Sequence, residues 1–290
     1  MRTLLLRHIY SGDVGFTAAF LIILIAATDL SGRLRDGRAA PVARVTFLVA
    51  LALGALAGTP LPLWLLVPLV GSLLLYGCLL LFDLESAFRR WSAVVVIGVI
   101  AMTVLAEGPY RFSAPRTLPA SSRLIVAGDS LASGGFDEQR RWIEILNERG
   151  TIEIVDQSRP SQDVAGAVSD LLQMETSSGS ALLILIGGND MLAGRSSSDF
   201  GEGLGRLVRT AIARGHDPIF LMELPVLPGR WGYAAQQRRI AREHDLVLIP
   251  KRVLAAVLSD HRNTSDGIHL TQRGHEQMAR RLAPWLDLEE

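Results

Sequence analysis

The sequence contains very little cysteine: Cys78 is the only one among 290 residues. A single cysteine cannot form an intrachain disulfide or build a cysteine-ligated metal site, so the redox compartment stays open. An excess of charge is also lacking, because 29 basic residues balance 29 acidic ones. With no basic stripe interleaved with aromatic residues, the sequence argues against a general nucleic-acid-binding protein.

Apolar residues are abundant, at 49% of the chain, and nearly all of the excess lies before about residue 107. Four apolar runs of roughly bilayer-spanning length occur there, at residues 14–30, 42–58, 63–82 and 91–106. Buried helices of a large soluble protein are a poor alternative, because these runs have no polar face for water. A cleaved signal peptide is an alternative for the first run alone. We therefore expect a transmembrane region over residues 1–106.

The basic loops of this region predict its orientation. One loop contains Arg33, Arg35 and Arg38, and another contains Arg89 and Arg90. Strict alternation puts both loops on one side of the membrane, and the positive-inside rule assigns that side to the cytoplasm. We expect an integral protein of a bacterial inner membrane, in contact with the lipid bilayer, with its C-terminal domain facing the periplasm or exterior.

The second half of the chain has the pattern of a separate α/β domain. Residues 107–122 contain three prolines among small polar residues, which is typical of an extended linker. Beyond them, amphipathic stretches separate five apolar strand-like runs, at residues 124–127, 152–155, 181–186, 218–221 and 246–249. This alternation predicts a three-layer domain with a parallel sheet over residues 123–290.

Residues suited to chemistry follow two of these runs. The first run ends in Gly128-Asp129-Ser130-Leu131, where a tight turn at glycine can leave the serine hydroxyl at the carboxyl edge of the sheet. The third run ends in Gly187-Gly188-Asn189-Asp190, where the asparagine can point an amide N–H at a ligand. Each pattern alone is also an ordinary turn signal.

A third pattern lies near the C-terminus. Asp266 precedes His269 by three residues, just before a helix that we expect to begin after Thr271. At this spacing the carboxylate can accept a hydrogen bond from one ring nitrogen, while the other ring nitrogen faces a nucleophile.

Taken together and in this order, the three patterns resemble the SGNH (GDSL) hydrolase family over about residues 123–287. The resemblance implies a flavodoxin-like hydrolase domain and an acyl-ester substrate, and it implies no cofactor. It further implies catalysis by Ser130 as nucleophile, His269 as base and Asp266 as the residue that orients the histidine.

The resemblance also implies an oxyanion hole formed by the backbone N–H groups of Ser130 and Ser161 and by the Asn189 side chain. Ser161 departs from the family pattern, which usually has glycine at this position. A backbone donor survives this change only if the φ and ψ angles needed there are open to a residue with a Cβ.

Three functions remain open at this stage. The first is a membrane-anchored serine esterase that hydrolyses an acyl ester of a lipid or of an acylated envelope component. The second is an O-acetyl esterase or O-acyltransferase that acts on an envelope glycan. The third is a non-catalytic membrane scaffold, against which the intact Ser130, Asn189, Asp266 and His269 argue, although Ser161 keeps it open.

Overall fold

The computed structural model describes residues 2–36, 39–84, 87–111, 118, 123–134, 139–149, 152–174, 179–226 and 229–286. The chain forms two compact units, one of residues 12–112 and one of residues 1–11 with 113–290. We expected residues 1–106 to form one region, but helix α1 (Arg2–Tyr10) belongs to the second of these units. There it contacts helix α12 (Lys251–Leu258), which is not among the helices predicted from the sequence.

The larger unit is built on a five-stranded sheet in which all neighbouring strands are parallel, as predicted. The order is β2-β1-β3-β4-β5, which is the flavodoxin-like order. The strands are β1 (Arg123–Gly128), β2 (Glu153–Asp156), β3 (Ala181–Leu185), β4 (Ile219–Met222) and β5 (Val247–Ile249). Strands β3 and β4 are buried along their whole length, which explains their unbroken apolar sequences.

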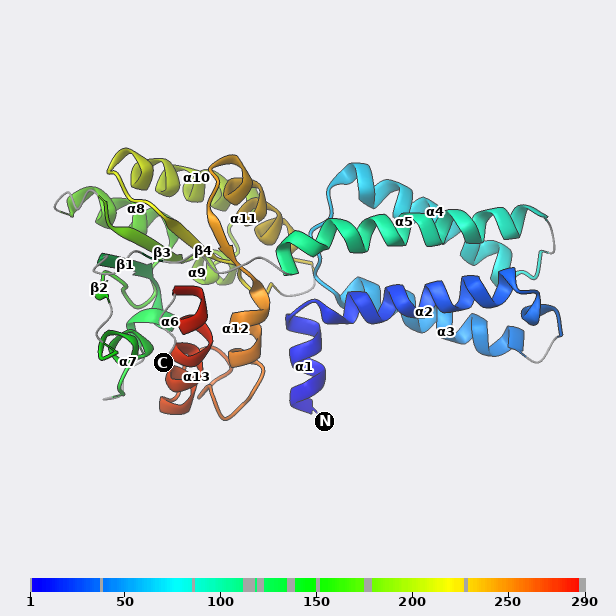
Figure 1. The fold of residues 1–290 in the computed structure, drawn as a ribbon, viewed down its shortest axis with the longest axis horizontal. Helices are drawn as coiled ribbons and strands as arrows, with labels where there is room; N and C mark the ends of the chain where they lie inside the picture. Colours follow the sequence, from blue (N-terminus) through cyan, green and yellow to red (C-terminus); the bar gives the residue numbers. More distant parts are fainter. Residues whose placement is uncertain are drawn as a thin grey trace. The chain divides into compact units, whose positions relative to one another are not determined.

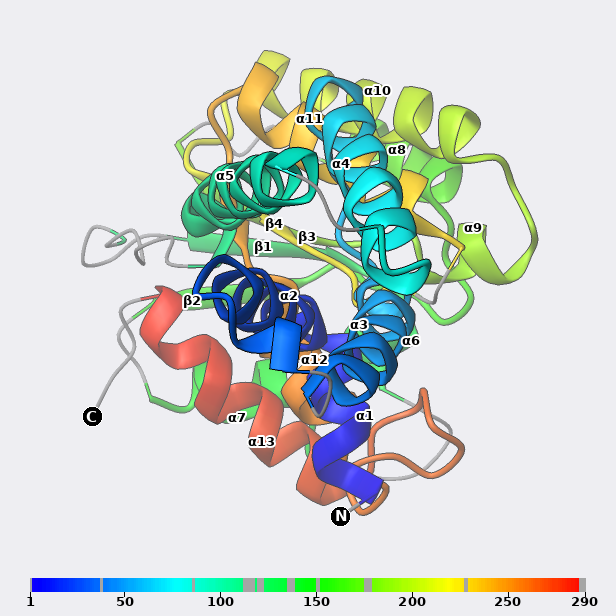
Figure 2. The same ribbon diagram turned by 90° about the vertical axis from the view of Figure 1, so that its right-hand side faces the viewer.

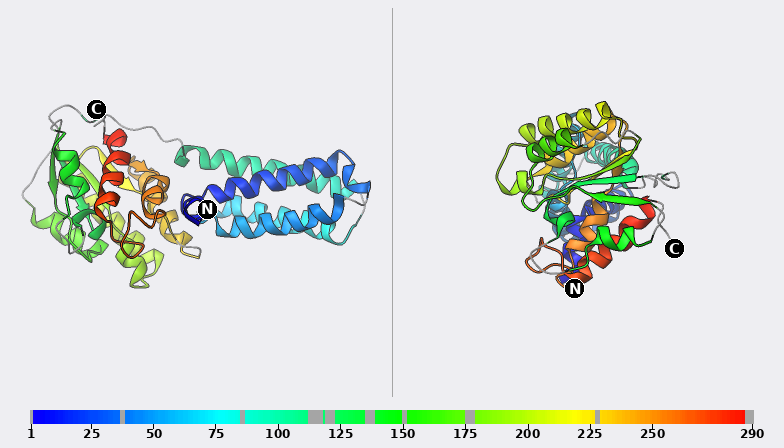
Figure 3. Two further views of the ribbon diagram at one scale, coloured as in Figure 1. Left: turned by 90° about the horizontal axis from the view of Figure 1, so that it is seen from below. Right: turned by 90° about the vertical axis from the view of Figure 1, so that its left-hand side faces the viewer.

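Helices cover both faces of this sheet (Figures 1 and 2). One layer contains α8 (Val164–Gln173), α10 (Ser197–Ala213) and α11 (Trp231–Glu243). The other contains α7 (Trp142–Asn147), α12 and α13 (Gln272–Leu282), which is followed by the 3₁₀ helix η2 (Ala283–Leu286). The right-hand view of Figure 3 shows the sheet between the two layers. The three-layer α/β prediction is therefore confirmed.

Local sequence sets where several of these helices begin. Thr271 precedes α13, and its side chain accepts a hydrogen bond from the backbone N–H of Gly274. Asp163 caps α8 in the same way, through the N–H of Gly166. Such caps satisfy backbone donors that have no partner within the helix.

The smaller unit is a bundle of four long apolar helices: α2 (Asp13–Leu30), α3 (Ala39–Leu56), α4 (Leu63–Leu81) and α5 (Ala87–Arg111). A short 3₁₀ helix, η1 (Arg33–Asp36), follows α2. All four helices are long and apolar enough to cross a membrane. Helix α5 continues past residue 106, so residues 107–111 of the expected linker are helical, and this helix ends two residues after Pro109. Apart from Leu118, the rest of that segment lies outside the described residues.

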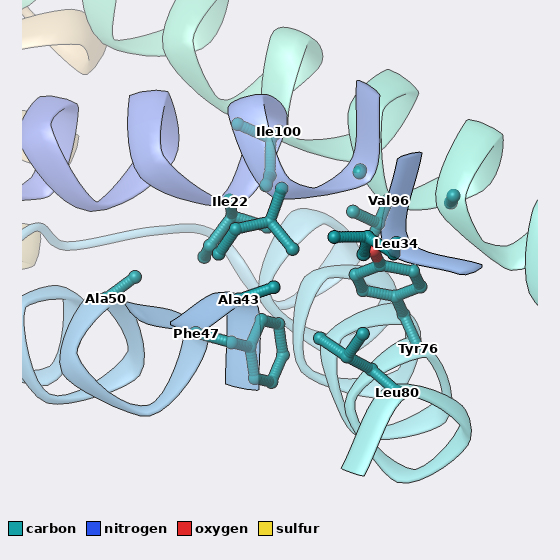
Figure 4. Close-up of a cluster of buried hydrophobic side chains, with 12 residues drawn as sticks. Ile22, Leu34, Ala43, Phe47, Ala50, Tyr76, Leu80, Val96 and Ile100 are labelled. Atoms are coloured by element: carbon teal, nitrogen blue, oxygen red, sulfur yellow. The ribbon is translucent and has the colours of Figure 1, made fainter. Parts of the chain in front are cut away.

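The interior of the bundle is tightly packed (Figure 4). The rings of Phe47 and Tyr76 meet edge to face, with centroids 5.9 Å apart. A Cβ at Gly77 would lie 2.6 Å from a Phe47 ring carbon, so glycine at this position lets α4 approach α3 closely. Large apolar side chains are exposed on the outside of the bundle, among them Val45, Leu48, Val67, Leu74, Trp91 and Leu105. An apolar exterior of this kind suits contact with lipid.

Ion pairs join α2 and α5 at both ends. Near the end of α2, Asp29 lies 2.9 Å from Arg89, and both side chains are buried. At the start of α2, Asp13 pairs with Arg111, and both of these side chains are partly exposed. Since each pair joins the start of one helix to the end of the other, α2 and α5 run antiparallel.

Candidate active site

The strand order β2-β1-β3-β4-β5 places its reversal point at the carboxyl ends of β1 and β3. These strands are neighbours, and the chain leaves them toward opposite edges of the sheet, which is where open α/β sheets bind ligands. Ser130 is the first residue of the short helix α6 (Ser130–Ser133), directly beyond β1. Asn189 is the second residue of the short helix α9 (Gly188–Leu192), beyond β3. The fold thus brings the predicted nucleophile and the predicted amide donor to adjacent strand ends.

Close packing surrounds the turn that presents Ser130. A Cβ at Gly128 would lie 2.6 Å from the Ala132 Cβ and 3.3 Å from the Ser158 Cβ, so a larger residue would displace the turn. The Asp129 carboxylate accepts a hydrogen bond of 3.0 Å from the N–H of Leu131, which caps α6. The Ser130 side chain is left half-buried.

Asp129 lies at the centre of the site. It is buried, and burial is the main reason why its pKa is raised to about 6, although the hydrogen bond from Leu131 opposes the shift. The charge of His269 lowers this pKa and the charge of Asp190 raises it, both by less than burial does. One Asp129 oxygen lies 3.3 Å from the position that a Cβ on Gly188 would take, so the serine turn also adjoins the start of α9.

Asp266 and His269 form the contact that their spacing suggested. The Asp266 carboxylate lies 2.6 Å from Nδ1 of His269. It also accepts hydrogen bonds from the backbone N–H groups of His269, at 2.8 Å, and Ile268, at 2.9 Å. These hydrogen bonds hold the pKa of Asp266 well below its usual range, so the carboxylate stays ionised at neutral pH. The other ring nitrogen, Nε2, remains available for a nucleophile.

Among the residues that the structure describes, one predicted contact of the triad, between the Ser130 hydroxyl and the His269 ring, is not formed as a hydrogen bond. Within the described part of the chain, no hydrogen bond connects the Ser130 hydroxyl to His269. Such contacts are often long in free enzymes and tighten when substrate binds.

Ser161 lies in a turn that forces an unusual backbone conformation on it. Its φ is 59°, in the left-handed region. The N–H of Gln162 donates to the carbonyl of Arg159 at 3.3 Å, with Pro160 as the second residue of the turn, an arrangement typical of a type II turn. A residue with a Cβ can adopt this region at a cost of roughly 1–2 kcal/mol, so serine is compatible with the turn but strained.

The Ser161 turn adjoins Asn189. One hydrogen of the Asn189 amide donates to the carbonyl of Gln162 at 2.9 Å. The second hydrogen of the same nitrogen remains for a ligand, because a side-chain amide nitrogen carries two donors. The backbone of the turn and the Asn189 side chain therefore lie side by side.

We expect Ser161→Gly to raise the free energy of unfolding by about 1 kcal/mol, because glycine adopts positive φ without steric cost. Thermal unfolding of the full chain in detergent measures this change. Ser169→Gly is the matched control, since Ser169 is an exposed serine within α8, where glycine costs about 0.5–1 kcal/mol. Equal destabilisation by both substitutions contradicts the strain argument.

The described residues contain no group of three or more His, Cys, Asp or Glu side chains that could hold a metal ion. Arg195, which follows α9 and pairs with Asp163, is not among the site residues predicted from the sequence. No sequence pattern marks it, since it belongs to none of the three motifs.

Comparisons with known structures agree with this fold. A crystal structure of the psychrotrophic esterase EstA from Pseudoalteromonas sp. has a TM-score of 0.51 and 19% identity, and the match covers 56% of this chain and 94% of that chain. A crystal structure of TesA has a TM-score of 0.52 and 23% identity, with 58% of this chain and 100% of that chain covered. At these identities the likeness establishes the fold. No curated protein sequence matched the chain significantly.

The sequence was also compared with known protein families. Residues 126–277, just over half of the chain, match the GDSL-like Lipase/Acylhydrolase family, and the match includes Ser130, Ser161, Asn189, Asp266 and His269. Together with the parallel sheet and its strand order, this match identifies the chain as a member of the GDSL-like lipase/acylhydrolase family of serine ester hydrolases.

Proposed function

We propose that this protein is a membrane-anchored serine esterase that hydrolyses the acyl ester of a lipid or of an acylated envelope component. One observation carries the proposal. Ser130 and Asn189 lie at adjacent strand ends, and the Asp266 carboxylate lies 2.6 Å from Nδ1 of His269.

The proposed reaction proceeds through an acyl-enzyme. The Ser130 Oγ attacks the ester carbonyl while His269 takes its proton, and Asp266 orients the ring and stabilises the imidazolium. His269 then gives the proton to the departing alcohol, and a water molecule hydrolyses the acyl-serine ester. The oxyanion accepts hydrogen bonds from the N–H groups of Ser130 and Ser161 and from the free hydrogen of the Asn189 amide.

Exposed apolar side chains near the proposed catalytic residues favour a substrate with an apolar acyl group. Ile268, 39% exposed, directly precedes His269, and Leu192, 62% exposed, ends the helix that begins beside Asn189. An acyl chain that covers such side chains buries more apolar area, and gains more binding free energy, than a hydroxyl-rich glycan does. We therefore favour the lipid or acyl-chain ester over the acetylated glycan.

The bundle is the proposed anchor. Its helices are long and apolar enough to cross a bilayer. Arg33 and Arg90 are exposed near the ends of α2 and α5 that the Asp29–Arg89 pair joins. By the positive-inside rule this end faces the cytoplasm, which supports placing the hydrolase domain on the periplasmic or outer side of a bacterial inner membrane.

The test is a substrate panel with the full chain in detergent micelles. We expect hydrolysis of aryl esters and a higher kcat/KM for an eight-carbon than for a two-carbon acyl group. Leu192→Ser should lower kcat/KM for the longer ester about fivefold, the equivalent of roughly 1 kcal/mol of lost apolar contact. Leu172→Ser is the matched control, because Leu172 is 59% exposed but lies near the end of α8.

Two results would overturn the proposal. An absence of ester hydrolysis across the panel would refute the esterase function. Faster deacetylation of an O-acetylated oligosaccharide than of any acyl-chain ester or lysophospholipid would favour the glycan esterase instead.

A further inference from the structure

Three consecutive residues beyond the Ser161 turn are each bound to the segment that begins with Asn189. The carbonyl of Gln162 accepts from the Asn189 side chain at 2.9 Å. The carboxylate of Asp163 lies 2.6 Å from a guanidinium nitrogen of Arg195. The N–H of Val164 donates to the buried carboxylate of Asp190 at 3.0 Å. Two stretches that are far apart in sequence are thus joined residue by residue.

The Arg195 guanidinium lies beside both carboxylates in these contacts, those of Asp163 and Asp190. Its Nη2 binds Asp163, and its Nε lies 3.6 Å from the second oxygen of Asp190, which is fully buried. Burial raises the pKa of Asp190, because a carboxylate loses stabilising water there. The nearby positive charge of Arg195 opposes that shift and favours the ionised form that accepts from Val164.

The backbone of Arg195 is held on both sides. Its N–H donates to the carbonyl of Asp190 at 3.1 Å. Its carbonyl accepts from the Tyr233 hydroxyl at 2.8 Å, and the Tyr233 ring stacks on Phe200. The guanidinium therefore extends from a fixed point, although its side chain is 47% exposed.

We propose that Arg195 is a positioning residue for the oxyanion hole. Through Asp163 and Asp190 it holds the strained Ser161 turn against α9, so that the Ser161 N–H and the Asn189 amide keep the spacing that a tetrahedral oxyanion needs. This inference rests on the proposed esterase function. It adds to that function a residue outside the three sequence motifs, which acts through two carboxylates rather than on the substrate.

A role in stability alone and a role in positioning the oxyanion donors predict different effects of removing Arg195 on unfolding and on kcat. A half-exposed ion pair contributes little to stability, so its loss leaves unfolding nearly unchanged. Oxyanion donors act mainly in the transition state, and removing one costs about 10²–10³-fold in kcat. Loosening two donors without removing either should therefore lower kcat by about tenfold and leave KM within about twofold.

The variants are Arg195→Gln, Asp163→Asn and the double substitution, each in the full chain in detergent. Asparagine at residue 163 keeps the helix cap, because it caps as well as aspartate does, but it loses the ion pair. Arg195→Lys should restore part of kcat. Arg239→Gln is the matched control, since Arg239 is 46% exposed, pairs with Glu243 and belongs to α11.

We expect each single variant to lose about tenfold in kcat, and we expect the double variant to lose no more than about twofold beyond either single variant. Arg239→Gln should retain wild-type kcat. The proposal is overturned if kcat is unchanged in Arg195→Gln, or if Arg239→Gln loses as much kcat as Arg195→Gln. It is also overturned if the loss of kcat in the double variant equals the product of the losses in Arg195→Gln and Asp163→Asn.

Amide hydrogen exchange separates this inference from the proposed function. In Arg195→Gln, a peptide containing residues 159–164 should exchange faster than in the wild type, while a peptide from α11 should not change. Unchanged exchange at residues 159–164 refutes the positioning role. If the wild-type chain hydrolyses no ester, the proposed function fails, and the exchange experiment still decides whether Arg195 holds this segment.

Discussion

Replacing Ser130 with alanine is expected to abolish ester hydrolysis, with kcat falling by at least about 10⁴-fold. Alanine removes the hydroxyl oxygen of the proposed nucleophile and leaves the neighbouring cap of Asp129 on Leu131 in place. Steady-state rates of the full chain with an aryl ester measure the loss. An active-site-directed phosphonate provides a second measurement, because it should add its mass to the wild type and not to this variant.

Ser133→Ala is the matched control for this prediction. Ser133 is the last residue of the same short helix α6, and its hydroxyl lies at the long distance of 3.5 Å from the carbonyl of Gly134. We expect its rate to stay within about threefold of the wild type. If Ser130→Ala retains a comparable rate, Ser130 is not the nucleophile.

The second large effect is expected in the membrane bundle. Asp29→Ala should destabilise the bundle by about 3–5 kcal/mol, because the buried guanidinium of Arg89 loses a buried carboxylate that lies 2.9 Å from it. Asp83, 3.6 Å from the same guanidinium and largely exposed, offers only partial compensation. Unfolding of the full chain by titration with SDS, followed by circular dichroism, measures the change.

Two comparisons sharpen this test. Asp13→Ala breaks the partly exposed pair with Arg111 at the opposite ends of the same helices, and should cost at most about 1 kcal/mol. A double substitution of Asp29 and Arg89 by leucine should recover much of the loss, since no unpaired charge then remains buried. If Asp29→Ala and Asp13→Ala are equally mild, burial does not govern these pairs.

Much of the candidate site could be recognised from sequence because its parts are local. The Asp266–His269 contact joins residues three apart, and the cap of Asp129 on Leu131 joins residues two apart. Contacts of this kind depend on one short stretch of backbone. The apolar strand runs were recognisable for a similar reason, since burial on both faces of a parallel sheet requires continuous apolar sequence.

Other features could not be predicted because their partners are distant in the chain. The strain at Ser161 is a property of the folded turn. The contacts of Arg195 with Asp163 and Asp190 exist only because α9 and the start of α8 meet at the sheet edge. Helix α1 gave no sign in the sequence that it would contact α12 rather than join the bundle.

The amino-acid sequence by itself determined the two-part organisation, the parallel α/β pattern and the residue types available for ester hydrolysis, because periodicity and short spacings act between near neighbours. Only the tertiary structure decided that β1 lies beside β3, which residues hold the Ser161 turn, and that Asp29 is buried against Arg89. The physical reason is that strand order and long-range pairing depend on how whole elements pack together, and no local stretch of sequence encodes that packing.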